Sequence, residues 1–387
     1  MALNLAAVPV ELGFLPPQQA IEDPEHPGLL RAGPRAAAPY GDDRVEFNTC
    51  TATDLSVSSG ALPDLVQHGL DTVDLGGLGA LQEACSRALA AGRVVPDDAQ
   101  AIRGALDGAE LRCASGRSLT VRFLAGEGFF MRTVGPRRLA MVPPDADGMN
   151  NHGGAVAVHA DQDVYGTPLV QLMGGRAPEL FRHVSPDGEN HGADLMLVNL
   201  WVPLQQVVAP LVLADGQSID RRRHQLRYGL PTTSFLEREE GMEINDIWSF
   251  LHDDAQRWYF RSSMDYRTAW VFNTLSTPHG AGVLPGEDLA ARCVQVLGDV
   301  EGAAGRNDVA ALEAALAEVA YTSVPEGVPA PLNAAIERML ELCGVAAADL
   351  PGTLTDIGGE WSGAASAARR AVVRMSLELR LVVSITD

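Results

Sequence analysis

Residues 155–161 read AVAVHAD, and this run decides the fold that the sequence predicts. Residues two apart point to the same face of a β-strand, so His159 and Asp161 are expected on one face of an apolar strand. Two histidines and one carboxylate are the ligand set of many non-haem iron centres, and they leave positions open for a co-substrate and oxygen. The run therefore predicts a β-strand that carries two metal ligands.

A second histidine for such a site comes late in the chain. Residues 269–279 read AWVFNTLSTPH, an apolar strand pattern that ends at His279. This histidine follows Asp161 by 279 − 161 = 118 residues, enough chain for the intervening strands of a barrel. We predict that His159, Asp161 and His279 bind one metal ion. The alternative is a buried histidine whose partner is a neighbouring carboxylate.

A second His-x-Asp sequence, at His252 and Asp254, has different neighbours. Residues 248–258 read WSFLHDDAQRW, with apolar residues at helical spacing. On a helix, residues i and i+2 do not face the same way. We therefore predict a helix here, without metal ligands.

Around the three ligands the chain resembles the Fe(II)- and 2-oxoglutarate-dependent dioxygenases, most nearly the phytanoyl-CoA dioxygenase-like group. The likeness is carried by HAD at residues 159–161, by LVNLWVPL at residues 197–204 with PLVL at 210–213, and by the strand ending at His279. It implies a double-stranded β-helix, or jelly roll, with flanking helices. It also implies that the two histidines and the aspartate hold Fe(II), with 2-oxoglutarate and O2 as co-substrates.

Three further residues match positions that this family uses around its co-substrate. The strand after the first two ligands often carries a tryptophan beside the metal, and Trp201 matches it. Asn199 shares the strand face of Trp201 by the period of two, so it is expected to point at the co-substrate. The family grips the far carboxylate of 2-oxoglutarate with a basic residue shortly after the second histidine. Arg292, at 292 − 279 = 13, matches that residue, and the alternatives are a surface role for Arg292 or the use of Arg306.

All 29 basic residues are arginine, since the sequence contains no lysine. This excludes a phosphate-binding loop of the G-x-x-x-x-G-K type, a pyridoxal Schiff base and a lysine nucleophile. An anionic co-substrate would then be held by arginine, whose planar fork makes two parallel charge-assisted hydrogen bonds to a carboxylate.

Two features depart from the family pattern. A Gly-Ala-Gly run follows His279 where many relatives place serine or threonine, so a hydroxyl partner for the co-substrate must come from elsewhere. Residues 173–194 form an insertion rich in Gly, Pro, His, Asp and Asn, which we interpret as a candidate lid or substrate-contacting loop. Gln162 and Tyr165, just after the first two ligands, are candidate substrate contacts.

Bulk composition limits the class of protein. With 387 residues, 46% of them hydrophobic, the chain can bury a large core. Its net charge of −21 argues against a nucleic-acid partner and favours a cationic small-molecule substrate. Five cysteines without a C-x-x-C pair fit neither a disulfide framework nor a zinc ribbon, and no apolar run is long enough to span a bilayer. We predict a cytoplasmic protein with no membrane partner; the oligomeric state is open.

We expect three segments. Residues 1–117 form an irregular and helical segment that packs on the core, residues 118–300 form the catalytic β-helix, and residues 301–387 form a helical extension. Helical patterns occupy residues 64–106, 308–320 and 332–343. The final stretch continues as helix or ends in a closing strand over residues 381–385.

The resemblance implies oxidation, by default hydroxylation, of an unactivated C–H bond in a small molecule. The lysine-free, Ala- and Gly-rich composition suits bacterial natural-product biosynthesis, and Asp161 disfavours a halogenase because related halogenases replace that carboxylate with glycine or alanine. One alternative is a cupin-like zinc or manganese hydrolase or isomerase that does not use 2-oxoglutarate. The other is a metal-free jelly-roll binding protein, in which replacing His159 leaves function intact.

Overall fold

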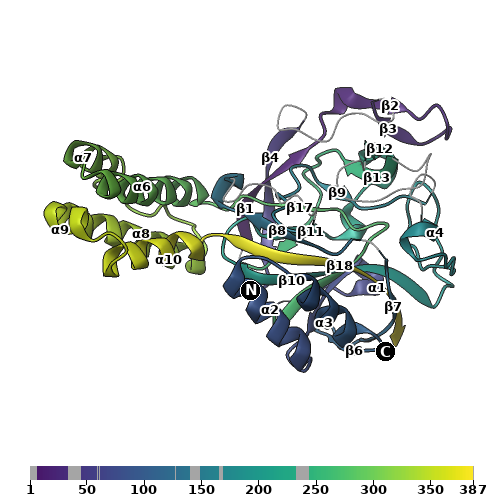
Figure 1. Ribbon diagram of the computed structural model, residues 1–387. Helices are drawn as coiled ribbons and strands as arrows, with labels where there is room; N and C mark the ends of the chain where they lie inside the picture. Colours follow the sequence, from purple (N-terminus) through teal and green to yellow (C-terminus); the bar gives the residue numbers. More distant parts are fainter. Residues whose placement is uncertain are drawn as a thin grey trace.

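Two large β-sheets pack face to face, and helices lie outside them (Figure 1). The computed structural model describes residues 7–33, 45–58, 60, 62–126, 128–139, 149–164, 169–231 and 244–386. The sheets are mainly antiparallel, as in a jelly roll. The predicted double-stranded β-helix is therefore confirmed.

The first sheet contains both histidine-bearing strands, β9 and β17. Its order is β1 (Ala7–Phe14), β4 (Glu46–Asp54), β14 (Trp258–Phe260), β11 (Leu211–Ala214), β17 (His279–Ala281), β9 (His159–Ala160), β13 (Ile244–Phe250), β12 (Gln225–Pro231), β3 (Leu30–Ala32) and β2 (Ala20–Glu22). The β3–β12 and β4–β14 pairs are parallel. Strands β9 and β17 are neighbours, so two distant parts of the chain meet there.

The second sheet is built around the long strand β10. Its order is β15 (Met264–Asp265), β10 (Leu195–Gln206), β16 (Thr268–Asn273), β5 (Leu70–Asp74), β6 (Glu110–Cys113), β7 (Ser118–Leu124), β18 (Arg374–Thr386) and β8 (Phe130–Val134). Strand β10 also pairs with β18, so the strands from β10 round to β18 form a closed ring.

The alternation along β10 separates an outer face from an inner one. Met196, Val198 and Leu200 pack in one apolar cluster with α2 (Gly79–Ala91) and α3 (Pro96–Leu106), outside the sheet. Asn199 and Trp201 point toward the first sheet, because successive side chains of a strand alternate. The inner face is therefore where polar residues of the second sheet meet the histidines of the first.

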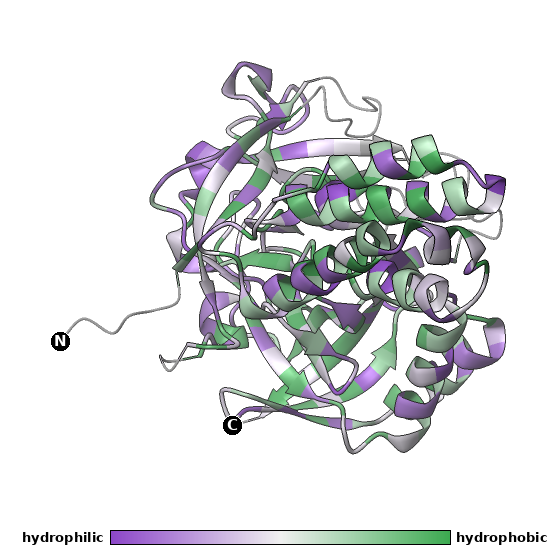
Figure 2. Cartoon of the chain, turned by 90° about the vertical axis from the view of Figure 1, so that its left-hand side faces the viewer, coloured by the Kyte–Doolittle hydropathy of each residue, from purple (hydrophilic) through white to green (hydrophobic). Residues whose placement is uncertain are grey.

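Five helices are inserted between β17 and β18 and project from the sheets as an arm (Figure 1). They are α6 (Glu287–Arg306), α7 (Val309–Ala317), α8 (Ala330–Ala348), α9 (Leu350–Thr355) and α10 (Glu360–Ala371). Figure 2 looks onto this bundle and shows that its helices carry both apolar and hydrophilic residues. The apolar residues join the core of the first sheet in one cluster, so the arm is packed onto the jelly roll.

Glu287 anchors the root of the arm. Its side chain is fully buried and accepts hydrogen bonds from the backbone N–H groups of Ala209, at 2.7 Å, and Leu284, at 3.0 Å. A third N–H, from Arg137, donates at 2.8 Å. One carboxylate thus ties the start of α6 to two loops of the core.

The helical patterns of the sequence are largely confirmed. Residues 64–106 contain α1 (Leu65–His68), α2 and α3, with β5 between the first two, and the two later patterns fall in α7 and α8. Of the two alternatives for the final stretch, the closing strand is right, since β18 runs from Arg374 to Thr386. The remaining short helices are α4 (Leu169–Leu172), α5 (Arg221–His224), η1 (Pro17–Gln19), η3 (Pro136–Arg138) and η4 (Gly216–Ser218).

Two expectations about local structure are wrong. Residues 248–258 do not form a helix, because β13 ends at Phe250 and a turn leads into β14. His252 packs edge-on against Phe14, with ring centroids 5.1 Å apart. The N-terminal segment is not irregular and helical only, since β1, β4 and β5 pair into the two core sheets. The helical extension expected over residues 301–387 also ends in a core strand, as the closing-strand alternative allowed.

All five cysteines are buried and free. Burial raises the pKa of the Cys85 thiol to about 12, so it stays protonated at neutral pH. Among the described helices, none has both the length and the apolar character that crossing a bilayer requires.

Candidate metal centre

His159 and His279 face each other across two neighbouring strands. They are register partners in the β9–β17 pair, and their ring centroids lie 4.4 Å apart. Asp161 follows β9 directly, two residues after His159. One ligand atom from each of the three side chains lies within 4.8 Å of the other two, the one such group found in the described part of the chain. The structure thus brings together the three residues that the sequence singled out.

Backbone carbonyl groups fix the orientation of both imidazole rings. Nδ1 of His159 lies 3.0 Å from the Ala157 carbonyl oxygen, and Nδ1 of His279 lies 3.0 Å from the Thr277 carbonyl oxygen. A carbonyl oxygen only accepts, so each neutral ring carries its hydrogen on Nδ1 and donates it. Each Nε2 then presents a lone pair.

Both Nε2 atoms point at the Asp161 carboxylate. The distance is 3.6 Å to Oδ1 from His159 and 3.8 Å to Oδ2 from His279. Burial lowers the pKa of His279 to about 4, and His159 adds to this effect, so the ring is neutral at neutral pH. Burial opposes ionisation of Asp161, but the positive charge of Arg380 acts against it, and the pKa of this carboxyl lies well below its usual range.

Three buried acceptors therefore converge with no hydrogen between them. Such a group is costly to bury unless something positive lies among its lone pairs. Two imidazole nitrogens and one carboxylate oxygen on one side of an ion are the donor set that suits Fe(II) with open positions. The residues present thus fit an iron ion.

Contacts from the second sheet hold Asp161 in place. Asn199 donates a side-chain hydrogen bond to Asp161, and Thr274 donates to the Asn199 amide oxygen at 3.2 Å. Nη2 of Arg380 lies 3.5 Å from Asp161 Oδ1. Partners of this kind orient a metal ligand and commonly affect metal affinity strongly. Asn199 thus positions a ligand, and its predicted contact with the co-substrate stays a prediction.

A small cavity adjoins the two histidines. Its lining includes His159, His279 and four polar or aromatic residues from the inner face: Arg132, Trp201, Arg374 and Glu378. Nε1 of Trp201 is buried without a hydrogen-bond partner. The tryptophan predicted from the sequence therefore lies beside the ligands, with its N–H unused.

Arg374 is a buried cation in this cavity. Arg374 is only 1% exposed, and it forms no ion pair with any carboxylate of the described residues. Nη1 donates to the Ala209 carbonyl oxygen at 2.6 Å, whereas Nε has no partner. Burial and the nearby Arg132 together lower the pKa of Arg374 to about 10, against the opposing effect of Glu378 and Glu287, so the group stays protonated at neutral pH.

The neighbouring arginine, Arg132, is already paired. Its Nε and Nη2 both donate to the Glu378 carboxylate, the latter at 3.2 Å. Arg132 also donates to the Gly153 carbonyl oxygen at 2.6 Å. Arg374 is therefore the guanidinium in this cavity whose charge is left for an anion.

Arg292 does not lie in this cavity. It is exposed on helix α6, and Arg306 is exposed at the end of the same helix. The spacing of 13 residues assumed that the core strand after β17 follows at once, but the arm is inserted there. The next core strand is β18, which places Arg374 at 374 − 279 = 95 residues after His279.

A signal for Arg374 was present in the sequence. Residues 374–381 read RMSLELRL, with polar and apolar residues alternating as in a half-polar strand. Ser376, Glu378 and Arg380 lie opposite Pro203, Trp201 and Asn199 of β10, and Arg374 lies with Glu378 in the lining of the cavity. Of the other candidates, Gln162 is buried, and its amide oxygen lies 3.1 Å from Arg380 Nε when turned toward it. Tyr165 lies outside the described residues.

Comparison with protein-family models gives no match. No curated protein matches the sequence either. Among solved structures, the chain is similar to "iron and alpha-ketoglutarate-dependent endoperoxidase NvfI", with 14% identity, 98% of each chain covered and a TM-score of 0.42. A different conformation of that protein gives 13% identity, 98% of each chain covered and a TM-score of 0.43. A single-residue variant of that protein gives 13% identity, 99% of each chain covered and a TM-score of 0.44. A likeness this distant assigns neither activity nor substrate to this chain.

Proposed function

We propose that this chain is an Fe(II)- and 2-oxoglutarate-dependent oxygenase. The observation that carries the proposal is the convergence of three buried acceptors beside a buried arginine that has no carboxylate partner in the described residues. His159, Asp161 and His279 would hold the ion on one side. Arg374 would hold the far carboxylate of a dicarboxylic co-substrate, because its planar fork matches a carboxylate.

The chain's own residues account for binding and orientation. The Nδ1 hydrogens of His159 and His279 stay on backbone carbonyls, so both Nε2 lone pairs remain directed at the ion. Asn199 and Arg380 hold the Asp161 carboxylate in one orientation. When bound, iron with 2-oxoglutarate and O2 supplies the oxidising power that adds oxygen to a substrate.

Apolar side chains exclude water from this side of the site. Trp201, Trp270 and Phe272 form one buried cluster, and the Phe272 ring centroid lies 4.6 Å from that of His279. Attraction between Arg374 and a bound carboxylate would be strengthened in such surroundings, because little solvent screens it. The free Trp201 N–H offers a further hydrogen bond in the same cavity.

The finer assignment is also a proposal. We propose hydroxylation of a C–H bond in a small molecule, in cytoplasmic natural-product biosynthesis. The carboxylate at Asp161 supports oxygenation over halogenation, and the buried, free cysteines are compatible with a reducing compartment.

The test is an anaerobic titration of the Fe(II)-loaded protein with 2-oxoglutarate, followed by the weak visible charge-transfer band of the chelated complex. We expect a band that needs about 10–100-fold more 2-oxoglutarate in Arg374→Gln and that is unchanged in Arg292→Gln. A folded, iron-loaded protein that gives no band would remove the co-substrate assignment. The zinc or manganese hydrolase or isomerase, which needs the same triad but no dicarboxylate, would then be favoured.

A further inference from the structure

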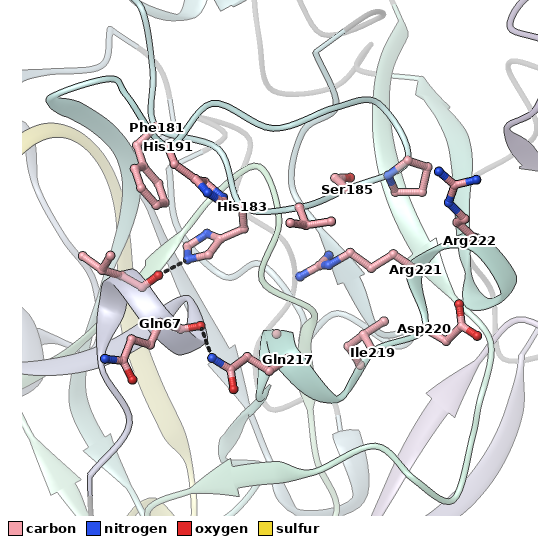
Figure 3. Close-up of a pocket in the computed structure, with 14 residues that line it drawn as sticks. Gln67, Phe181, His183, Ser185, His191, Gln217, Ile219, Asp220, Arg221 and Arg222 are labelled. Atoms are coloured by element: carbon pink, nitrogen blue, oxygen red, sulfur yellow. Dashed lines mark hydrogen bonds between the residues drawn. The ribbon is translucent and has the colours of Figure 1, made fainter.

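A second and larger pocket lies away from the metal ligands (Figure 3). Its volume is about 720 Å³, and its lining does not include His159, Asp161 or His279. Three parts of the chain form its walls: the end of α1, residues 181–191 of the insertion, and residues 216–222 around η4 and α5. Gln217 donates to the Gln67 carbonyl oxygen at 3.2 Å and joins the first wall to the third.

Arg221 supplies a buried positive charge to this pocket. The residue is 8% exposed, and its guanidinium points into the pocket toward His183 (Figure 3). Its Nη1 donates to Gln225 Oε1 at 3.0 Å and to the Ser276 carbonyl oxygen at 2.9 Å, both uncharged. No carboxylate of the described residues lies within ion-pair distance, and Asp187 acts on it only from further away. A desolvated cation with neutral partners is stabilised by an incoming anion.

Two further charged residues, Asp220 and Arg222, line the pocket, and both are exposed; the rest of the lining is largely apolar. Burial lowers the pKa of His183 to about 4, and its Nε2 lies 2.8 Å from the Val66 carbonyl oxygen. His191 stacks on Phe181, with ring centroids 5.3 Å apart and an interplanar angle of 20°. The pocket thus combines one buried charge, on Arg221, with aromatic and aliphatic walls, the usual composition of a site for a small organic ligand.

We propose that this pocket binds an organic anion: a carboxylate, sulfonate or phosphate ester carried on an apolar or aromatic body. The anionic group binds at Arg221, and the apolar body lies against Phe181 and His191. This proposal does not rest on the function proposed above, because binding here is measurable without iron or 2-oxoglutarate. It differs from the cationic substrate predicted from the net charge of −21, because that charge is a sum over the whole chain, whereas a ligand meets only the groups that line its pocket.

The pocket is joined to both segments that carry metal ligands. Arg221 bonds to the carbonyl of Ser276, and Nδ1 of His183 lies 3.2 Å from the Ser276 hydroxyl, three residues before His279. On the other side, the backbone N–H of Val164 donates to Asp187 at 3.4 Å, three residues after Asp161. The loop that walls the pocket therefore bridges the two ligand-bearing segments.

The experiment compares two fluorescent probes that share one ring system. One is 1-anilinonaphthalene-8-sulfonate, which is anionic, and the other is the uncharged N-phenyl-1-naphthylamine. In titrations of the full chain we expect saturable binding of both, with the anionic probe bound about tenfold more tightly or better, as a charge-assisted contact in a buried site provides. Equal affinity for the two probes, or no saturable binding of the anionic probe, overturns the proposal.

Variants locate the charge that gives the preference. Arg221→Gln keeps a polar side chain but removes the charge, so the affinities for the two probes should become about equal while binding of the neutral probe persists. Arg222→Gln removes a charge from the exposed neighbour on the same wall and should leave the preference intact. A preference retained in folded Arg221→Gln contradicts the assignment.

A second variant keeps the proposal testable if Arg221→Gln does not fold. His191 is exposed, so His191→Ala should fold normally while removing the ring that stacks on Phe181. We expect both probes to bind several-fold more weakly to it. Unchanged affinity for both probes would place their binding elsewhere and overturn the proposal.

Discussion

Two buried charged clusters lie next to each other in the first sheet, and they differ in how their charges are matched. One is the metal centre. The other is a network of five side chains, each of them 0–2% exposed: Asp23, Arg31, Asp163, Arg227 and Asp246. Arg227 reaches all three aspartates, at 2.7 Å from Asp163, 2.8 Å from Asp23 and 3.2 Å from Asp246. Arg31 reaches Asp23 and Asp246, both at 3.2 Å.

The difference separates a structural cluster from a binding site. In the network every carboxylate has a guanidinium donor, so burial of the charges is compensated within the protein. At the metal centre three acceptors face one another, and in the adjoining cavity Arg374 is a donor without a carboxylate. Burial of charge alone therefore indicates nothing about function. Unmatched charge of one kind indicates a missing partner.

The largest effect is expected from the metal ligands. His279→Ala removes one of three converging acceptors, and Fe(II) affinity should fall about a thousandfold or more, because loss of outer partners alone often costs 10–100-fold. Anaerobic competition with a fluorescent chelator measures this. His252→Ala is the matched control and should bind Fe(II) as the unmodified chain does. Equal losses in the two variants would show that the triad is not the metal site.

Substitution in the five-residue charged network should lower the stability of the fold. Arg227→Met leaves three buried aspartates without their shared donor, and we expect the free energy of unfolding to fall by about 3 kcal/mol or more. Arg338→Met removes a pair with Glu341 in which the two side chains are 51% and 63% exposed, so it should cost less than about 1 kcal/mol. Urea denaturation compares the two. Similar losses would mean that the network is not distinguished by its burial.

Substitution of Arg374, in contrast to substitution of Arg227, should weaken binding of the co-substrate without destabilising the fold. Arg374→Gln is expected to raise the dissociation constant for 2-oxoglutarate about 10–100-fold, because a charge-assisted bidentate contact is lost. The free energy of unfolding should stay the same or increase, since an unmatched buried charge is removed. Calorimetric titration and urea denaturation measure the two quantities. Destabilisation as large as that of Arg227→Met would contradict the distinction between the two arginines.

A smaller effect is expected at His183, a partly buried base that stays neutral. His183 has a pKa of about 4 in the folded chain against 6.5 for an unperturbed histidine. As pH falls from 6.5 toward 4 the unfolded chain takes up a proton that the folded chain does not, so the free energy of unfolding decreases. Because His183 is only partly buried, we expect a loss of about 1 kcal/mol. Denaturation of the chain and of His183→Gln at both ends of this range measures it. An identical pH dependence of the free energy of unfolding in the two proteins would contradict this prediction.

The sequence predicts the elements whose pattern is local. Alternation places Asn199 and Trp201 on the inner face of β10, and the ligand chemistry of His159 and Asp161 is visible in three successive residues. The helix predicted over residues 248–258 was wrong because, over so few residues, a strand end followed by a turn can have apolar residues at helical spacing. The five-residue network could not be predicted, since its members lie between residues 23 and 246 without a shared motif.

Arg374 was missed for a different reason. A spacing between two functional residues is informative only when the chain between them has constant length, and the helical arm breaks that condition. Residues 287–371 belong to the arm, so the sequence separation between β17 and β18 is long. Each of the two strands nevertheless occupies its place in its own core sheet.

The helical arm also bears on how the chain folds. Between β17 and β18 lie 374 − 281 − 1 = 92 residues, and closing a flexible loop costs about 0.6 kcal/mol of entropy for each doubling of its length. Helices form from local contacts in microseconds, and α10 packs against α6, so the arm can draw its own two ends together before the sheets close. We therefore expect β18, with Arg374 and Arg380, to join last. Pulsed hydrogen exchange would contradict this order if β18 became protected before the arm. The metal centre would then be completed at the end of folding, when the final strand docks.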